Sequence, residues 1–452
     1  MRNPMFLADE RLISLVFGYC RDRLELDPVP LDFSAEREEL DRALEGLMTA
    51  TGNDPERVLE LFAGTLAPAV ISCDSPRFLA FIPAAPTKAS LLFDMIVSCS
   101  SLQGASWLEA AGAVAAENQA LRVIADMAGL PASAGGCFVS GGSAGNLSAL
   151  VVAREMGRHR LGPDGPARLR IAVSDQAHSS VAKALSVIGV DPFLVPTRGH
   201  RLTGEALEAA IGADPDPSTL VGVAATAGTT NAGIIDDLAG IGEVARRRDL
   251  WFHVDGAYGG AGLFAPSVRD RFAGVEMADS LVVDPHKWLF APFDCAALIY
   301  RNPNLAKAVH TQDASYLDVI HTDAEWNPSD YAYHLTRRAR GLAFWFSLAV
   351  HGTDAYRHAV QSAITVARQT ADLIAGTPGL SLVRDPDLSI VLFRRIGWGP
   401  DDYDEWSRRL LREQVGFVTP TKWEGETVAR FAFLHPDTNL QIVKEILDTM
   451  LS

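Results

Sequence analysis

From about residue 170 to residue 300, short apolar segments alternate with longer amphipathic ones. The short segments are rich in β-branched and other apolar residues, and they cover 170–173, 193–195, 220–224, 250–254, 281–283 and 296–300. Helical patterns separate most of them, at 180–188, 204–211 and 238–248. Strands of near-continuous apolar character that alternate with helices are typical of a mostly parallel sheet covered by helices on both faces. This part of the chain is therefore predicted to be α/β.

The N-terminal third has a different pattern. Its first 75 or so residues show the 3.6-residue periodicity of amphipathic helices, with Leu12, Val16 and Cys20 along one face. The segment 105–130 is rich in alanine and free of proline, which favours another helix. We therefore expect helices, and no sheet, before the α/β region begins.

The C-terminal part mixes both kinds of element. After a helix predicted over 342–351, it contains helices predicted at 354–375 and 439–451 and strands predicted at 389–394 and 428–433. This mixture indicates a small α+β domain. The expected organisation is a helical N-terminal segment (residues 1–75), a large α/β domain (76–352) and a small C-terminal α+β domain (353–452).

Composition and charge exclude several classes of function. Of the 452 residues, 48% are hydrophobic and 21% are charged, which is enough apolar material for a large core and argues against intrinsic disorder. The chain has 40 basic and 56 acidic residues, so its net charge is −16. A chain this acidic has no basic stripe for phosphate backbones or anionic lipids, so we expect neither nucleic-acid nor membrane partners.

The cysteines and the N-terminus bear on the cellular compartment. The five cysteines are scattered and form no CxxC pair, so neither a disulfide framework nor a metal site is expected. The first residues carry charges and lack the apolar stretch of a secretory signal. No stretch approaches the roughly 18 uninterrupted apolar residues of a membrane-spanning helix. These features favour a soluble, cytoplasmic protein.

Lysine is scarce in this sequence, with six residues: Lys88, Lys183, Lys287, Lys307, Lys422 and Lys444. Five of them lie in ordinary helical or polar turn contexts. Lys287 instead follows the apolar strand predicted at 281–283 and stands between His286 and Trp288. Burial there would lower the pKa of the amine, and Schiff-base formation requires a neutral amine. Lys287 is therefore the candidate for covalent catalysis.

A glycine-rich turn at 139–146, Val-Ser-Gly-Gly-Ser-Ala-Gly-Asn, opens a predicted helix. Unpaired backbone N–H groups and the helix dipole make such a turn an anion site, and phosphate is its usual ligand. A tight turn with a helix N-cap is an equally good interpretation. The turn also matches G-x-S-x-G, the nucleophile elbow of serine hydrolases, in which Ser143 would act with Asp387 and His435. The turn alone does not decide among these.

Two further polar residues follow predicted strands. Asp255 ends one strand and precedes small residues, and His178 follows the strand predicted at 170–173. Alone, Asp255 would be a cap and His178 an ordinary hydrogen-bonded histidine. Because the carboxyl ends of parallel strands lie at one edge of a sheet, however, Asp255, His178 and Lys287 are expected to converge near the glycine turn.

This combination favours a site for pyridoxal 5′-phosphate (PLP). The lysine would form a Schiff base with the cofactor, the carboxylate would keep the pyridine nitrogen protonated, and the turn would hold the phosphate. The serine-hydrolase interpretation leaves Asp255, His178 and Lys287 without a role.

The motifs also resemble those of a known family. The segments SDQAHSS (174–180), ATAGTT (225–230), HVDGAYGG (253–260), DPHKW (284–288) and RRARGLAFWFSLAVHG (337–352) resemble the group II PLP-dependent amino-acid decarboxylases in order and spacing. That family includes the aromatic-L-amino-acid, histidine and glutamate decarboxylases, and the resemblance runs from about residue 75 to the C-terminus. It implies the fold-type I architecture of PLP-dependent transferases. It also implies a homodimer with sites at the subunit interface, in which the N-terminal segment serves dimerisation.

The resemblance implies a role for each motif. Lys287 would be the Schiff-base lysine, Asp255 the partner of the pyridine nitrogen, and His178 the residue that stacks on the ring and contacts the substrate carboxylate. Ala257 would pack beneath the ring. The residues that would hold the phosphate are Gly142, Ser143, Thr230 and His286, with Asp284 beside them at a position that is often Asn in animal members.

The resemblance also implies the reaction, which is decarboxylation of an L-amino acid to the amine and CO2 through a Lys287 aldimine and a quinonoid intermediate. In this family a tyrosine on a mobile loop commonly returns the proton, and the matching region here is 314–333. Tyr331 is our candidate for this catalytic role, although Pro328 lies nearer the usual position and a packing aromatic is an equally good interpretation. Some relatives yield aldehydes by oxidative deamination, so an aldehyde synthase or another PLP lyase is the alternative.

The substrate is less well defined by the sequence. Ser75 stands where relatives often have His, and the Pro-Gly-Tyr-Leu run of aromatic decarboxylases is missing. Phe78, Phe81 and Trp107 are candidates for an aromatic-accepting pocket or for core packing, and no basic cluster commits the pocket to an acidic side chain. Aromatic amino acids are therefore among the expected substrates.

Overall fold

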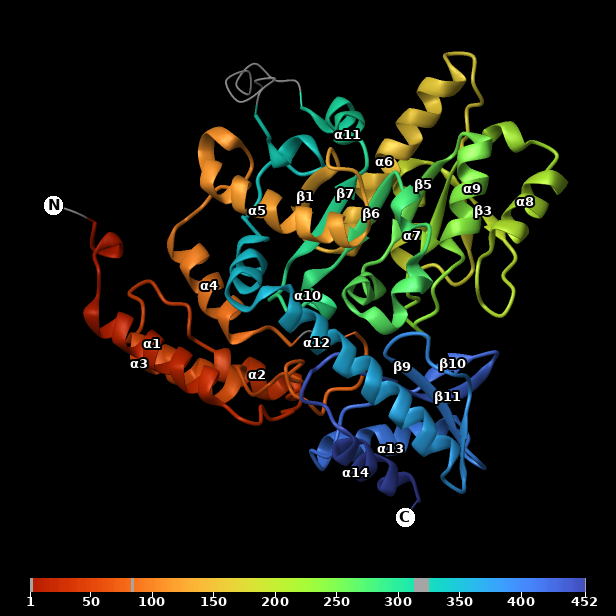
Figure 1. The fold of residues 1–452 in the computed structure, drawn as a ribbon. Helices are drawn as coiled ribbons and strands as arrows, with labels where there is room; N and C mark the ends of the chain where they lie inside the picture. Colours follow the sequence, from red (N-terminus) through yellow and green to blue (C-terminus); the bar gives the residue numbers. More distant parts are fainter. Residues whose placement is uncertain (1–2, 83–84, 313–324, 452) are drawn as a thin grey trace.

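The computed structural model describes residues 3–82, 85–312 and 325–451 (Figure 1). Its centre is a seven-stranded sheet in the order β1-β7-β6-β5-β4-β2-β3. The strands are β1 (Gly135–Val139), β2 (Arg170–Ser174), β3 (Asp191–Val195), β4 (Leu220–Thr226), β5 (Trp251–Asp255), β6 (Ser280–Val283) and β7 (Ala296–Tyr300). All neighbouring pairs are parallel except those of β7, which is antiparallel to β1 and β6. The predicted mostly parallel sheet is confirmed.

Helices cover both faces of this sheet, and this is why its central strands are largely apolar and buried, whereas the edge strand β3 is partly exposed. Successive side chains of a strand point to opposite faces, so Leu281 and Val283 of β6 lie in one core and Val282 in the other. The covering helices are α5 (Trp107–Met127), α6 (Gly142–Leu161), α7 (Ser179–Ile188), α8 (Gly204–Ala213), α9 (Leu238–Arg248), α11 (Pro303–His310) and α12 (Leu342–Ala375).

The C-terminal region forms a second, antiparallel sheet in the order β10-β11-β9-β8. Its elements are β8 (Leu380–Leu382), β9 (Ile390–Arg395), α13 (Pro400–Arg412), β10 (Thr421–Trp423), β11 (Glu426–Ala432) and α14 (Leu440–Leu451). The two helices predicted at 342–351 and 354–375 form the single long element α12, which is interrupted at Gly352. Gly352 has φ 73° and ψ 161°, a conformation that disfavours residues with a Cβ.

The N-terminal region is helical, as predicted, with α1 (Glu10–Glu25), α2 (Arg37–Leu44), α3 (Pro55–Leu61) and α4 (Lys88–Cys99). Shorter turns are η1 (Pro4–Phe6), η2 (Phe62–Leu66), η3 (Pro217–Thr219), η4 (Gly259–Phe264), η5 (Pro266–Phe272), η6 (Val275–Met277), α10 (Pro285–Trp288) and η8 (Pro328–Asp330). Helices α1 and α3 extend from the body as an arm (Figure 1). No side chain of α1 is buried within this chain, so the apolar face predicted there faces outward. In the part of the chain that the structure describes, no helix is both long and apolar enough to cross a lipid bilayer.

Candidate active site

A cavity of about 400 Å³ lies at the carboxyl ends of the parallel strands. The structure brings nine of the ten predicted site residues to its wall: Gly142, Ser143, His178, Thr230, Asp255, Ala257, Asp284, His286 and Lys287. They lie at the ends of, or just after, five different strands, β1, β2, β4, β5 and β6. Because these strands run in the same direction, their carboxyl ends meet at one edge of the sheet.

The glycine turn places the start of α6 against this cavity. The N-cap residue, Gly141, has no side chain to cap the helix, so the first backbone N–H groups depend on other partners. The N–H of Gly142 donates to Asp284 Oδ2 at 3.1 Å. A Cβ at position 142 would lie 2.9 Å from both the Ala257 Cβ and Asp284 Oδ2, so only glycine allows this close approach. The turn is thus an uncapped helix N-terminus that stabilises an anion.

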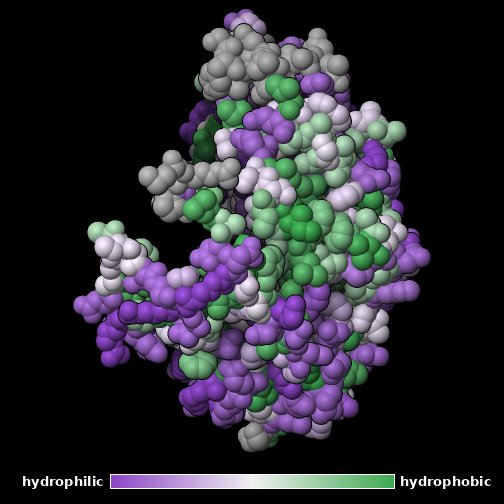
Figure 2. Space-filling model, turned by 90° about the vertical axis from the view of Figure 1, so that its left-hand side faces the viewer, coloured by the Kyte–Doolittle hydropathy of each residue, from purple (hydrophilic) through white to green (hydrophobic). Residues whose placement is uncertain are grey.

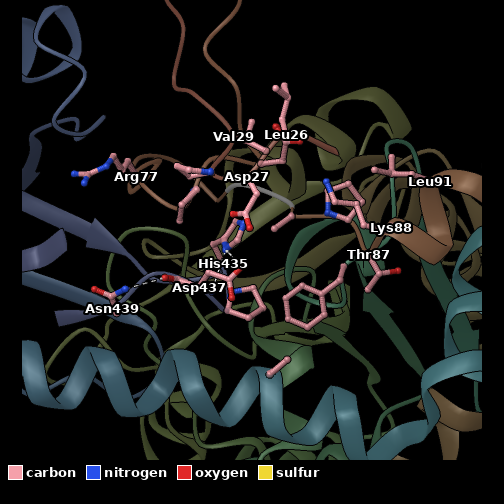
Figure 3. Close-up of a pocket in the computed structure, with 18 of the residues that line it drawn as sticks. Leu26, Asp27, Val29, Arg77, Thr87, Lys88, Leu91, His435, Asp437 and Asn439 are labelled. Atoms are coloured by element: carbon pink, nitrogen blue, oxygen red, sulfur yellow. Dashed lines mark hydrogen bonds and ion pairs between the residues drawn. The ribbon is translucent and has the colours of Figure 1, made fainter. Parts of the chain in front are cut away.

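The structure does not assemble the alternative serine-hydrolase site. Asp387 forms ion pairs with Arg201, Arg271 and Arg384, away from Ser143. His435 lines a separate cavity of about 1000 Å³, where Figure 3 shows it together with Lys88 and residues of the segment after α1. Neither Asp387 nor His435 lines the cavity that contains Ser143.

Lys287 lies in the short helix α10, and its Nζ is 3.0 Å from Asp284 Oδ2. Burial lowers the pKa of Lys287, but the negative charges of Asp284 and Asp255 and the hydrogen bond to Asp284 together outweigh it, so the pKa is raised. The lowered pKa expected from the sequence is therefore wrong for this chain. That expectation took burial into account but not the carboxylate three residues earlier in the same turn.

Asp284 is the centre of a small polar cluster. Besides Gly142 and Lys287, its Oδ2 has His286 Nε2 at 3.6 Å. Burial lowers the pKa of His286, and its Nδ1 accepts the N–H of Cys295 at 3.0 Å, so the neutral ring carries its proton on Nε2. The other oxygen of Asp284 is buried and has no hydrogen-bond partner among the described residues. The cluster thus keeps one acceptor available beside the glycine turn.

Asp255 is 5% exposed at the end of β5. Its Oδ1 accepts the N–H of Ala257 at 3.0 Å, and its Oδ2 accepts Asn146 Nδ2 at 2.8 Å. Ala257 adds a small apolar surface to the cavity wall. A buried carboxylate with two N–H donors and an apolar neighbour suits the edge and face of a cationic heterocycle.

Sequence reasoning missed several polar residues of the cavity wall, and two of them, Asn146 and Ser180, contact predicted site residues. Asn146 of α6 donates to Ser180 Oγ at 3.0 Å as well as to Asp255, and Ser180 Oγ lies 2.8 Å from His178 Nδ1. Asn146 is the last residue of the glycine-turn segment, and its side chain is 1% exposed. The sequence did contain a signal for Asn146, which is a polar residue one helical turn after Gly142, the first residue of α6.

Arg430 of β11 also approaches this edge and was missed. It is 5% exposed and donates to three backbone carbonyls, those of Thr230 at 2.6 Å, Phe81 at 2.9 Å and Asn231 at 3.2 Å. Burial lowers its pKa to about 10. Arg430 therefore connects the C-terminal sheet to the loop of Thr230.

The tenth predicted residue, Tyr331, does not line the cavity within this chain. It is 3% exposed, it stacks on Trp326 with ring centroids 4.3 Å apart, and burial raises its pKa. Residues 314–324 of the predicted lid lie outside the described residues. The role of Tyr331 as proton donor stays a prediction.

The predicted aromatic residues are not at this cavity either. Phe78 is buried against Phe417 with ring centroids 5.0 Å apart, Phe81 is 60% exposed, and Trp107 begins α5. None of the three lines the 400 Å³ cavity. In a single chain, Phe78 therefore has the packing role that the sequence left open.

The donor set fits PLP. The uncapped start of α6 suits a phosphate, Asp255 suits a protonated pyridine nitrogen, and Lys287 supplies the amine. A volume of about 400 Å³ is in the range of cofactor pockets.

Comparisons with known proteins agree with this geometry. Residues 38–396 match the family model described as the pyridoxal-dependent decarboxylase conserved domain. The aromatic-L-amino-acid decarboxylase of Bacillus atrophaeus is 31% identical over 410 residues, which cover 88% of this chain and 85% of that protein. The phenylacetaldehyde synthase of Arabidopsis thaliana is 27% identical over 411 residues, 86% of this chain and 84% of that one.

The crystal structure of Oryza sativa TDC with PLP and tryptamine is similar over 100% of both chains, with a TM-score of 0.90 and 25% identity. The fold and the sequence thus lead to the same group of enzymes. The chain belongs to the pyridoxal-dependent decarboxylase family, and PLP is its cofactor.

Proposed function

We propose that this enzyme decarboxylates an L-amino acid to the amine and CO2, with aromatic amino acids among its substrates. The observation that carries the proposal is that Lys287, Asp255 and the uncapped start of α6 line one cavity. The aromatic-L-amino-acid decarboxylase of B. atrophaeus supports the substrate class.

When bound, the cofactor supplies a covalent attachment point for the amine and a ring that withdraws electrons from the substrate's α-carbon. Lys287 would hold its aldehyde carbon, and Asp255 its pyridine nitrogen. Ala257 would contact one face of the ring and His178 the other, next to the substrate carboxylate. The phosphate would be held by Gly142, Ser143, Thr230 and His286.

Asp284 would control the proton on Lys287. Its carboxylate raises the pKa of Lys287, so the neutral amine appears only as the pH rises through that raised value. We expect Asp284→Asn to lower this pKa, and covalent loading of the apoenzyme with PLP should reach half of its maximal rate at a lower pH than in the unmodified enzyme. Following the visible absorbance after mixing, over a series of pH values, measures this shift.

Asp294→Asn is the control for this prediction. It removes a carboxylate nearby in sequence that pairs with Arg340 and does not raise the pKa of Lys287. Its loading profile should match that of the unmodified enzyme. Coincident profiles for Asp284→Asn and the unmodified enzyme would show that Asp284 does not retain the proton on Lys287.

An aldehyde synthase is the second candidate, because Tyr331 packs on Trp326 away from the cavity and because the phenylacetaldehyde synthase of A. thaliana is a relative. The decarboxylase returns a proton to the α-carbon and releases amine and CO2. The synthase instead consumes O2 and water and releases aldehyde, CO2, ammonia and hydrogen peroxide.

A screen of the proteinogenic amino acids, with CO2, amine and aldehyde all quantified, tests the proposed function. We expect amine and CO2 in equal amounts from an aromatic amino acid, without aldehyde. If Tyr331 returns the proton, Tyr331→Phe shifts the products from amine towards aldehyde, and an unchanged ratio leaves it a packing residue. Aldehyde from the unmodified enzyme would favour the synthase, and no CO2 from any amino acid would overturn both candidates.

We further propose a cytoplasmic homodimer with the three parts 1–75, 76–352 and 353–452. On α1, Leu12 and Val16 are each 40% exposed and Phe17 is 54% exposed, and Figure 2 shows a hydrophobic area on the body beside the projecting arm. A second copy would remove such apolar surface from water. The break in α12 at Gly352 supports the second boundary, and scattered cysteines that form no CxxC pair suit a reducing compartment.

A further inference from the structure

A continuous series of hydrogen bonds runs behind the cavity, from the beginning of β5 to α6. Trp251 Nε1 donates to Ser280 Oγ at 2.9 Å, and Ser280 Oγ lies 2.9 Å from His253 Nδ1. His253 Nε2 lies 2.9 Å from Asn146 Oδ1. All four side chains are buried, and His253 is 0% exposed. The series ends at the amide that contacts Asp255.

From Asn146 the series divides towards two residues of the cavity wall. Asn146 Nδ2 is 2.8 Å from Asp255 Oδ2 and 3.0 Å from Ser180 Oγ. Both the hydroxyl and the backbone N–H of Ser180 reach His178 Nδ1, at 2.8 and 3.2 Å. One amide group thus connects the two side chains that would contact opposite parts of the cofactor.

The carboxylate at one end and the indole at the other fix the direction of the series. The carboxylate of Asp255 accepts from Asn146 Nδ2, so Asn146 Oδ1 faces His253 Nε2 and needs a donor there. The indole N–H of Trp251 can only donate, so Ser280 Oγ accepts from it and its own proton is available to His253 Nδ1. Burial lowers the pKa of His253 to about 4, so the ring is neutral near pH 7 and has a single proton. That proton is on Nε2 and is donated to Asn146 Oδ1.

The orientation of the Asn146 amide follows. With Oδ1 facing His253, both protons of Nδ2 are donated, one to Asp255 and one to Ser180. The opposite orientation would set an amide oxygen 2.8 Å from a carboxylate oxygen, with no proton between them. His253, as the donor to Oδ1, therefore reinforces the orientation in which Asn146 stabilises a negative charge on Asp255.

The other end of the series is fixed in the same way. The backbone N–H of Ser180 can only donate, so His178 Nδ1 is an acceptor. The Ser180 hydroxyl, which accepts from Asn146, gives its proton to the same ring nitrogen. With its Nδ1 lone pair used as an acceptor, the ring of His178 carries its proton on Nε2.

We propose that Asn146 is a positioning residue, oriented by His253, that couples the charge of Asp255 to the tautomer of His178. The proposal rests on the proposed function, in which Asp255 and His178 contact the cofactor. It goes beyond it in assigning a task to His253, which lies on β5 and does not line the cavity. Burying a row of polar groups costs desolvation energy, which apolar side chains would avoid. The stabilisation of the charge on Asp255 is a reason for the protein to keep these polar groups.

Two substitutions of His253 separate this task from mere packing. His253→Phe keeps a ring but removes the donor to Asn146 Oδ1, so a buried amide oxygen loses its partner and the amide is held less firmly against Asp255. His253→Gln keeps an N–H that can reach this oxygen. A hydrogen bond that supports a charged group is worth roughly a tenfold change in an equilibrium constant. We expect the Kd of the apoenzyme for PLP to rise by about this factor in His253→Phe, with a displaced visible absorption maximum. His253→Gln should retain the affinity and the spectrum of the unmodified enzyme.

Ser347→Ala is the matched control, since it also removes a fully buried polar group. Ser347 Oγ lies 2.7 Å from Thr87 Oγ1 and accepts the Tyr356 hydroxyl at 2.6 Å, away from the cavity. It should lower the melting temperature and leave the PLP affinity and spectrum unchanged. The proposal is overturned if His253→Phe matches the unmodified enzyme in both readouts, or if His253→Gln changes them as much as His253→Phe does.

A measurement on the unmodified apoenzyme keeps the test open if His253→Phe does not fold. The nitrogen shifts of 15N-labelled histidine, assigned with His178→Gln, report the tautomer of His178. A proton on Nε2 is expected, and a proton on Nδ1 would overturn the proposal. Different results contradict the proposed function and this inference. An enzyme that develops no visible band with PLP contradicts the proposed function, whereas a band that the His253 variants leave unchanged contradicts this inference alone.

Discussion

Lys287→Ala is expected to develop no visible absorption band with PLP and to lose CO2 release by on the order of 10³-fold or more. Lys287 is the one lysine among the described residues that line the cavity, and its Nζ is held 3.0 Å from Asp284. Without this amine the cofactor has no covalent partner and the substrate amine has no group to displace. Absorbance spectra and CO2 release measure both effects.

Borohydride reduction identifies the attachment site independently of activity. Reduced cofactor should be found on the peptide that contains Lys287 in the unmodified enzyme and on no peptide of Lys287→Ala. Lys183→Ala is the matched control, because Lys183 lies in α7 and does not line the cavity. It should keep the band and the activity. Reduced cofactor on any other lysine would remove Lys287 from its assigned role.

The sheet was predictable where burial on both faces imposes a near-continuous apolar pattern. Strands β2 to β7 carry that pattern and were found within one or two residues of their observed ends. Strand β1 was not predicted, because it begins with two glycines. Its identity depends on pairing with β7, where a Cβ on Gly136 would collide with the carbonyl of Leu298. That requirement comes from tertiary structure and leaves no local signal.

Helix α13 was missed for a related reason. Its buried residues are Tyr403, Trp406 and Leu410, one on each of three successive turns, and charged or polar residues fill the positions between them. So narrow an apolar stripe is easily read as a polar loop. For α1 the apolar pattern was clear, and the helix was predicted. The pattern shows that one face of the helix is apolar, but it does not show what that face packs against.

The site was predictable to the extent that topology determines it. Polar residues after parallel strands must share an edge, so Asp255, His178 and Lys287 could be placed near the glycine turn. The family resemblance added Thr230, Ala257, Asp284 and His286. The pKa direction of Lys287 depends on a distance of 3.0 Å to Asp284, and the contribution of Asn146 depends on which of its amide atoms faces Asp255. Neither quantity is encoded in spacing along the chain. Distances and side-chain orientations of this kind are known only from the three-dimensional structure.

Asp255→Asn is expected to reduce kcat by about 10²–10³-fold, the typical cost of removing one preorganised electrostatic contact from an active site. A neutral amide cannot stabilise a protonated pyridine nitrogen, so the ring withdraws electrons less effectively. The new amide can still accept the Ala257 N–H, so the loop after β5 should keep its conformation. The visible band should form and shift, and kcat should fall much more than the affinity for PLP.

Asp279→Asn makes the same change at the other end of the same strands. Asp279 precedes β6 and accepts the N–H of Phe252 at 2.8 Å, and burial raises its pKa, so losing its charge affects stability rather than chemistry. We expect its kcat to equal that of the unmodified enzyme. If both variants lost kcat equally, the loss would come from disturbing the sheet. If only Asp255→Asn loses kcat, the loss comes from removing a negative charge at the carboxyl end of β5. This is the end of the strand at which the topology gathers the reactive groups.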